Sequence, residues 1–229
     1  MTHPWTAEAV RLIADEPDRI AELFPAAGRE VGRAPLSPEA DPLGLTIGTS
    51  DDVARESLVA ALLRALPSAD AATELADLYR YGDDAEQRGV LRGLNGAQSG
   101  GAIATDGSDA AGSQPETSAG LDPVVATGLG LVAEALRSND PRLVAAALGP
   151  FAAAHLDQHS WRHGVLKALF MGIPLDAVAG LDRRADAEVA RMAAGLVAER
   201  RAASRDVTDD MTRLAAGHET SNTTDPTED

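Results

Sequence analysis

The chain has 229 residues, which is enough for one domain with a real core or for two small lobes. Its formal charge is −16, and a surface of that sign repels phosphate backbones and anionic lipid headgroups, so nucleic acid and membrane surfaces are not expected partners. The absence of cysteine excludes thiol nucleophiles, disulfides, thiolate zinc sites and iron–sulfur clusters.

The sequence also bears on location. Residues 1–18 lack the basic start and the apolar run of a signal peptide. The longest apolar stretch, residues 124–136, is shorter than the ~18 uninterrupted apolar residues of a membrane helix and includes Glu134. We therefore expect a cytoplasmic protein that does not insert directly into a membrane.

Composition and periodicity predict an all-α protein. Aromatic residues make up 3% of the chain, and β-branched residues nowhere alternate as they do in a strand. Pro17 should interrupt the first helical stretch, and residues 25–48 should be mostly a connection, with at most a short helix at 26–32. Ser50 should cap the next helix, whose buried stripe should include Val53. The helical stretches expected in this N-terminal half, residues 1–94, are 6–24, 50–66, 69–81 and 84–94.

Two segments have a composition that is poor in large apolar residues. Residues 95–120 are mainly Gly, Ser, Ala and Thr, which cannot bury enough surface to offset the entropy of ordering them. We predict a flexible insertion there, followed by a C-terminal helical half at residues 121–205. Residues 206–229 are predicted to be a disordered acidic tail.

The C-terminal half carries several helix-start signals. Asp140 followed by Pro141, then Asp157, and then Asp186 each have the residue type and position of a helix N-cap. Gly149 and Pro150 should bend or break the helix that contains them. Short helices joined by short turns, without a strict repeat, predict irregular stacked helical hairpins or a bundle.

The helix predicted from Asp157 is apolar around most of its circumference, yet His159, His163 and Lys167 recur on one face at four-residue spacing. The two histidines have the spacing of a helical metal-binding pair but lack an obvious third ligand, so we favour one being exposed and the other bonding a core carbonyl. Lys167, the only lysine, could be a catalytic amine of lowered pKa; an ion pair with an acid such as Asp182 is the favoured alternative.

The turn at residues 181–186 concentrates charge between two helices. Arg183 and Arg184 beside a helix N-terminus could receive a carboxylate or a phosphate. Alternatively, Arg184 or Arg191 could pair internally with a nearby acid such as Asp182 or Glu188.

Arg29 is a weaker candidate for an anion site. It shares a helical face with Arg33 if this stretch is helical, but the flanking glycines lack the Gly-Lys-Ser/Thr ending of a phosphate loop. The sequence contains no G-x-S-x-G or H-E-x-x-H motif and no dinucleotide-binding fingerprint, so no catalytic motif indicates an active site.

Two C-terminal segments resemble a known family. Residues 161–170 read WRHGVLKALF and residues 181–192 read LDRRADAEVARM, followed by ERRAASR at residues 199–205. Together they resemble the C-terminal signature of the EboA family, whose usual Asn after Trp161 is here Arg162 and which often has an amide at the position of His163. The matching charged residues are Lys167, Asp182, Arg184 and Arg191.

The resemblance implies a helical protein without known catalytic activity. It implies an operon shared with a prenyltransferase-like membrane protein and metabolic-enzyme-like proteins, which is associated with trafficking of a precursor metabolite toward the periplasm. We therefore expect a non-enzymatic component, without a cofactor, that binds a small acidic or aromatic metabolite or an operon partner protein. The alternatives are a structural helical scaffold with a buried ion-pair network and, less favoured, an enzyme that uses Lys167. The expected binding residues are Trp161, Lys167, Asp182, Arg183, Arg184, Arg191 and Arg29.

Overall fold

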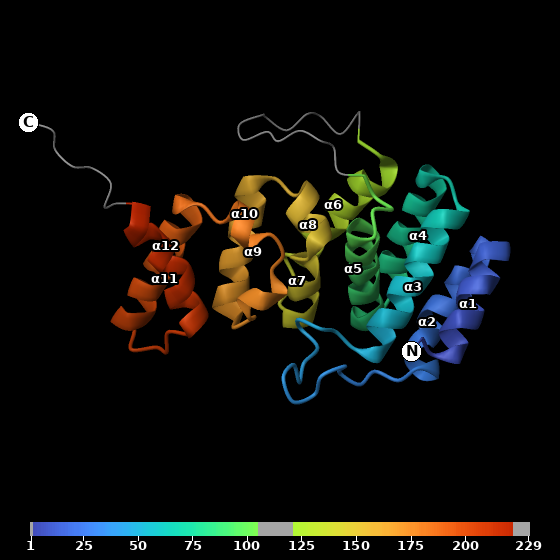
Figure 1. Ribbon diagram of the computed structural model, residues 1–229, viewed down its shortest axis with the longest axis horizontal. Coiled ribbons are helices and arrows are strands. Elements are labelled where there is room, and N and C mark those ends of the chain that lie inside the picture. Colours follow the sequence, from blue (N-terminus) through green and yellow to red (C-terminus); the bar gives the residue numbers. More distant parts are fainter. Residues whose placement is uncertain (1, 105–120, 222–229) are drawn as a thin grey trace, which may run out of the picture.

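The computed structural model describes residues 2–104 and 121–221. Within these ranges the regular structure is helical, with no strand and a single isolated bridge between Pro35 and Thr49. The helices lie side by side in an elongated row that begins with α1 at one end and finishes with α11 and α12 at the other (Figure 1). The predicted all-α fold is therefore confirmed.

The first helices differ from the prediction at one proline. Pro17 starts a separate 3-10 turn, as expected, but α2 continues through Pro25 into the segment that was expected to be mostly a connection. A proline inside a helix costs about 3 kcal/mol. Burial of the apolar side chains around it, at about 1.5–3 kcal/mol each, offsets that cost. The elements are α1 (Pro4–Asp15), η1 (Pro17–Arg19) and α2 (Ile20–Glu30), and α2 buries Ile20, Leu23, Phe24 and Ala27.

The connection from α2 to the next helix is an ordered loop. The carboxylate of Asp41 accepts the backbone N–H groups of Leu45, Thr46 and Ile47 at 2.7–2.9 Å. Although burial alone would raise it, these backbone hydrogen bonds hold the pKa of Asp41 below its ordinary value. The guanidinium of Arg92 donates to the carbonyls at the tip of the same loop, which fixes the loop against α5.

Three long helices follow, namely α3 (Ser50–Ala65), α4 (Ser68–Tyr81) and α5 (Asp84–Ser99). The N-cap of α3 is Thr49 rather than Ser50, because Thr49 and Asp52 form a reciprocal capping box. Val53 is 45% exposed, so its assignment to the buried stripe was wrong.

The predicted start of the flexible insertion at residue 95 was also wrong, because α5 continues to Ser99. Asn95 is buried, and its side chain bonds the carbonyl of Ala146 and the N–H of Phe151. The glycines of α5 are close-contact positions: a Cβ on Gly93 would lie 2.5 Å from Val59. Gly96, one of the small residues that suggested flexibility, is such a position too, because a Cβ on it would meet the side chain of Glu56 on α3. Residues 105–120 of the predicted insertion lie outside the described residues.

The C-terminal helices begin where their capping residues predicted. Asp140, Asp157 and Asp186 each accept a backbone N–H in the first turn of α7, α9 and α11. The predicted break at Gly149 and Pro150 separates α7 from α8. The elements are α6 (Pro123–Ala135), α7 (Pro141–Ala147), α8 (Pro150–His155), α9 (Gln158–Met171), η3 (Leu175–Ala177), α10 (Leu181–Arg184), α11 (Ala187–Ala202) and α12 (Asp209–Ser221).

The segment predicted to be a disordered tail contains α12, so that prediction was wrong for its first part. Met211 and Leu214 are buried, and α12 packs along α11 (Figure 1). A short amphipathic helix of this kind is stabilised by the apolar face it buries rather than by its own propensity. Residues 222–229 lie outside the described part of the chain.

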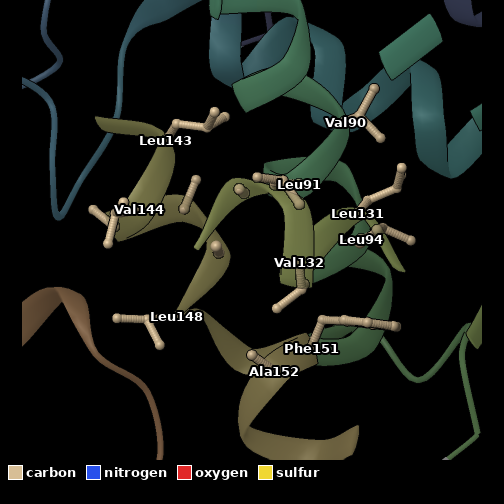
Figure 2. Packing of buried hydrophobic residues seen from close by; sticks show 14 of the residues in the cluster. Val90, Leu91, Leu94, Leu131, Val132, Leu143, Val144, Leu148, Phe151 and Ala152 are labelled. Carbon is tan, nitrogen blue, oxygen red and sulfur yellow. The ribbon is translucent and has the colours of Figure 1, made fainter. Parts of the chain in front are cut away.

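One hydrophobic core extends along the row, across the point at which the sequence suggested two halves. Figure 2 shows its central part, where side chains of α5, α6, α7 and α8 meet around Leu91, Val132, Leu148 and Phe151. Within the described ranges, no helix has both the length and the apolar character needed to cross a lipid bilayer.

Candidate functional site

The segment that resembles the EboA signature is organised around Trp161, which α9 places in the core with none of its surface exposed. The guanidinium carbon of Arg184 lies 5.0 Å from the centre of its ring, which is the geometry of a cation–π contact. In the described ranges the indole N–H has no hydrogen-bond partner. Trp161 therefore acts as an apolar platform for Arg184 inside the row of helices.

Arg184 is directed inward, to the end of a neighbouring helix. Its Nη1 donates to the carbonyls of Ala152 and Ala153 at 2.9 and 3.2 Å, and its Nη2 donates to the carbonyl of Leu156 at 2.6 Å. Its Nε donates to Gln158 Oε1 at 3.1 Å. Burial lowers the pKa of Arg184, although an arginine remains charged in proteins. The side chain thus caps the C-terminus of α8, with little donor capacity left for an external anion.

Lys167 does the same for another helix. Its Nζ donates to the carbonyl of Leu136 at 2.7 Å, and Leu136 is the C-cap of α6. Asp182, its expected partner, is exposed. A cation at a helix C-terminus satisfies carbonyls that lack an intrahelical donor and interacts favourably with the helix dipole. Lys167 and Arg184, two of the three cations that match the EboA signature, therefore hold helix ends.

Asp186 is the best-bonded carboxylate of this region. It accepts the N–H of Val189 at 3.0 Å as the N-cap of α11, and Arg162 Nε donates to both of its oxygens at 3.0 and 3.1 Å. Gln158 Nε2 donates to Asp186 Oδ2 at 3.1 Å. The side-chain hydrogen bond from Arg162 is the main reason why the pKa of Asp186 falls to about 2. The bonds of Arg162 and Gln158 join α9 to the start of α11.

Arg162 and Gln158 were not among the binding residues predicted from the sequence. The departure from the EboA pattern at Arg162 was visible in the sequence, but its partner lies 24 positions away and on a different helix. Only packing of α9 against α11 identifies that pair.

The remaining expected residues are on the surface. Arg191 pairs with Glu188 at 2.7 Å on the exposed face of α11, which is the internal pairing considered as an alternative. Asp182 and Arg183 are exposed on α10, and Arg29 is exposed near the end of α2, close to the opposite end of the row (Figure 1). The structure therefore does not bring Arg29 to the other candidates.

Both His159 and His163 are exposed, so the expected bond from one of them to a core carbonyl does not form. Their ring centroids are 4.4 Å apart in an edge-on arrangement. Over the described ranges there is no group of three or more His, Asp or Glu side chains that could hold a metal ion.

A cleft of about 620 Å³ lies beside this region, between η3 and α10 on one side and α11 and α12 on the other. Buried side chains of Leu175, Val178 and Leu214 contribute to its apolar lining, and small residues of α11 leave it open. Its size falls in the usual range for small-molecule sites, roughly 300–1,000 Å³. The charged lining residues are Asp176, Asp182, Asp186 and Arg213.

The polar groups of the cleft are not equally available. Arg213 Nη2 lies 3.1 Å from Asp210 and 3.5 Å from Asp176, so this guanidinium is held by two carboxylates. Asp210 also accepts the N–H of Leu175 at 2.8 Å, which fixes α12 to η3. The carboxylate of Asp182 makes no hydrogen bond or ion pair within the described part of the chain. Asp182 is therefore the free acceptor of the lining.

A glycine shapes the wall of the cleft. Gly180, just before α10, has φ +77°, and a Cβ on it would lie 3.0 Å from the Cβ of Ala153. The left-handed conformation and the close approach both favour glycine. They place α10 so that Arg184 points to α8 while Asp182 faces the cleft.

A second charged cluster lies in the N-terminal half and was not found from the sequence. Asp51, Asp52, Arg55 and Arg88 are each at most 4% exposed. Arg55 pairs with Asp51, and Arg88 Nε donates to Asp52 at 2.8 Å. Thr49 donates to Asp51 and accepts a bond from Arg88. The two acids lie in the first turn of α3, and the packing of α3 against α5 buries them.

Comparison with known proteins gives one match, which lies in the C-terminal half of the chain. No curated protein and no solved structure matches the chain. A family model does match residues 129–216, which extend from α6 into α12 and include Trp161, Lys167, Arg184 and every lining residue of the cleft except Gly217. Residues 129–216 match the model of the EboA family, described as metabolite traffic protein EboA, and this match confirms the resemblance predicted from the sequence.

Proposed function

We propose that this protein is a non-catalytic binding component of a metabolite-traffic system, and that it takes a small molecule in the cleft between η3–α10 and α11–α12. The observation that carries the proposal is the cleft itself, whose lining residues except Gly217 lie within the segment matched by the EboA family model. Its apolar lining suits the body of a small metabolite, and its polar rim can orient one.

The surroundings of the cleft favour binding over catalysis. Lys167 and Arg184, the cations with the best claim to chemistry, donate to backbone carbonyls of α6 and α8. Neither side chain lines the cleft, and Asp186 is held by Arg162. A general base or nucleophile must lie within hydrogen-bond reach of its substrate. Lys167 and Arg184 do not reach the cleft, and the oxygens of Asp186 are already bonded.

A structural scaffold is the second candidate, and the same carbonyl caps favour it. Lys167 and Arg184 join α6, α8, α9 and α10 into one unit, so an intact row could itself be the feature that a partner protein recognises. In that case Lys167 and Arg184 stabilise helix ends by bonding their carbonyls. The scaffold hypothesis had instead expected a buried ion-pair network in this region. Occupancy of the cleft separates the two candidates.

The test is a blocking substitution in the cleft. Ala187 is exposed at the start of α11 and lines the cleft, so Ala187→Trp should fill it without disturbing the core. The wild-type protein is screened by thermal shift against metabolite probes that carry amine, hydroxyl or carboxylate groups. A probe at one hundred times its Kd should stabilise the folded state by about 2.7 kcal/mol.

The control is Ala198→Trp, an exposed position on the same helix that does not line the cleft. We expect Ala187→Trp to abolish binding of every probe that stabilises the wild-type protein, whereas Ala198→Trp should retain it. Equal binding by both variants, or no stabilisation of the wild-type protein by any probe, would contradict the proposed function.

A further inference from the structure

The polar groups of the cleft differ in what they can offer to a ligand. Four charged residues line it, three of them carboxylates, so its lining has more acceptors than donors. Arg213, the one cation among those four, bridges Asp210 and Asp176 at 3.1 and 3.5 Å. Both contacts use Nη2, so the charge of Arg213 is already balanced by carboxylates before any ligand binds.

The carboxylate of Asp186 is occupied as well. It accepts bonds from Arg162, from Gln158 and from the N–H of Val189, and these partners approach it from α9 and from α11. Its charge therefore stays balanced by Arg162 and its oxygens have little remaining capacity. Asp186 shapes the lining but is not the group that a ligand would bond first.

Asp182 is left as the acceptor that faces the cleft without a partner in the described part of the chain. The cations next to it in sequence are placed elsewhere: Arg184 donates to the carbonyls of α8, and Arg183 is exposed outside the lining. Arg183 comes near the lining only at Gly180, where an ideal Cβ would lie 3.8 Å from its Nη2.

Resting on the proposed function, we infer that the cleft takes a ligand with an apolar body and a protonated amine, and that the amine bonds Asp182. The apolar side chains of Leu175, Val178 and Leu214 receive the body, and a carboxylate is the natural partner of an ammonium group. A ligand with a carboxylate or a phosphate would face Asp182 and Asp176 and be disfavoured. This differs from the acidic metabolite that the sequence suggested as one possibility.

Three probes with the same indole body test the inference: tryptamine, tryptophol and indole-3-propionate, which end in an ammonium, a hydroxyl and a carboxylate. Their Kd values are measured by titration calorimetry at pH 7 and low salt. We expect tryptamine to bind at least tenfold more tightly than indole-3-propionate, with tryptophol between them. Added salt should raise the Kd of tryptamine and leave the Kd of tryptophol unchanged, because salt screens the attraction between the ammonium group and Asp182.

Asp182→Asn should raise the Kd of tryptamine about tenfold, because one charge-assisted hydrogen bond is lost. It should change the Kd of tryptophol by less than threefold. The matched control is Asp77→Asn, an exposed acid on α4 far from the cleft, which should change neither. Tighter binding of indole-3-propionate, no effect of Asp182→Asn, or no binding of tryptamine would overturn the inference.

The same titrations separate this inference from the proposed function. If all three probes bind equally and Ala187→Trp abolishes them, the cleft is a binding site and the assignment of an amine is wrong. If Ala187→Trp leaves the binding of every probe unchanged, the cleft is not the site and the proposed function fails with it.

Discussion

Two charged regions of the molecule use the same residue types in different ways. In the N-terminal half, Arg55 and Arg88 are buried and face the carboxylates of Asp51 and Asp52. In the C-terminal half, Arg184 and Lys167 are half-buried and donate to backbone carbonyls at helix ends. In the first region both acids are paired with arginines, whereas in the second the acid Asp182 has no ion-pair partner in the described ranges and faces a cleft.

The comparison teaches that a buried charge cluster and a candidate site are different things. Removing charges from water is costly unless opposite charges face one another, and in the N-terminal cluster Arg55 and Arg88 face Asp51 and Asp52. In the described ranges Arg55 Nη2 has no hydrogen-bond partner, but the charges of this structural cluster are matched. Lys167 and Arg184 also have structural partners, but those partners are neutral carbonyls. Neither of these two cations therefore neutralises the charge of Asp182.

The largest effect should come from the N-terminal cluster. Arg55→Met leaves the fully buried carboxylate of Asp51 without its main partner, and breaking a buried pair in this way should lower the free energy of unfolding by about 3–5 kcal/mol. Urea denaturation followed by circular dichroism measures it. The double variant Asp51→Asn with Arg55→Met should recover most of the loss. A loss below 1 kcal/mol for Arg55→Met would mean that the pair is not buried as described.

The next effect should come from Arg184. Arg184→Met removes the donor to three carbonyls at the end of α8 and the contact with Trp161. The free energy of unfolding should therefore fall by about 2–3 kcal/mol. Arg184→Lys should recover less than half, since one ammonium cannot reproduce the planar fork. Ligand affinity of the folded variant should be retained. A folded Arg184→Met protein of wild-type stability that no longer binds probes would reverse these assignments.

Lys167 should have a smaller effect of the same kind. Lys167→Met retains the apolar stem and removes one charged donor to the carbonyl of Leu136, at a cost of about 1–1.5 kcal/mol. The midpoint of urea unfolding, with an unchanged slope, measures it. The variant should also show unaltered reactivity toward carbonyl metabolites under borohydride, because the proposal gives this amine no covalent role. A borohydride-trapped adduct at Lys167 in the wild-type protein would instead support an enzyme.

The smallest effect should appear as a pH dependence. The folded-state pKa of Asp186 is about 2, below the ordinary value of 3.8, so its contribution to stability is complete above about pH 4 and is lost as the pH falls toward 2. Because the side chain is 37% exposed, solvent screening should reduce this contribution to about 1 kcal/mol. Arg162→Met should flatten the stability profile between pH 4 and pH 2. An unchanged profile would show that Arg162 does not hold Asp186.

The sequence by itself determined features that depend on a few neighbouring residues. The N-caps Asp140, Asp157 and Asp186 were predicted correctly, because the capping bond joins a side chain to the backbone two or three positions later. The break at Gly149 and Pro150 has the same local origin. The candidate segment was also recognisable, since its signature is contiguous.

Tertiary structure decided whatever depends on a distant partner. The glycines and alanines of α5 suggested flexibility by composition, yet Asn95 bonds the carbonyl of Ala146, which lies 51 positions away. The helix α12 carries few apolar residues and gains its stability by packing on α11, which creates the cleft beside Asp182. Arg184 looked like an anion receptor because a sequence does not specify which way a guanidinium points. Its direction is set by the carbonyls of α8 and the ring of Trp161, which only the packed helices bring within reach.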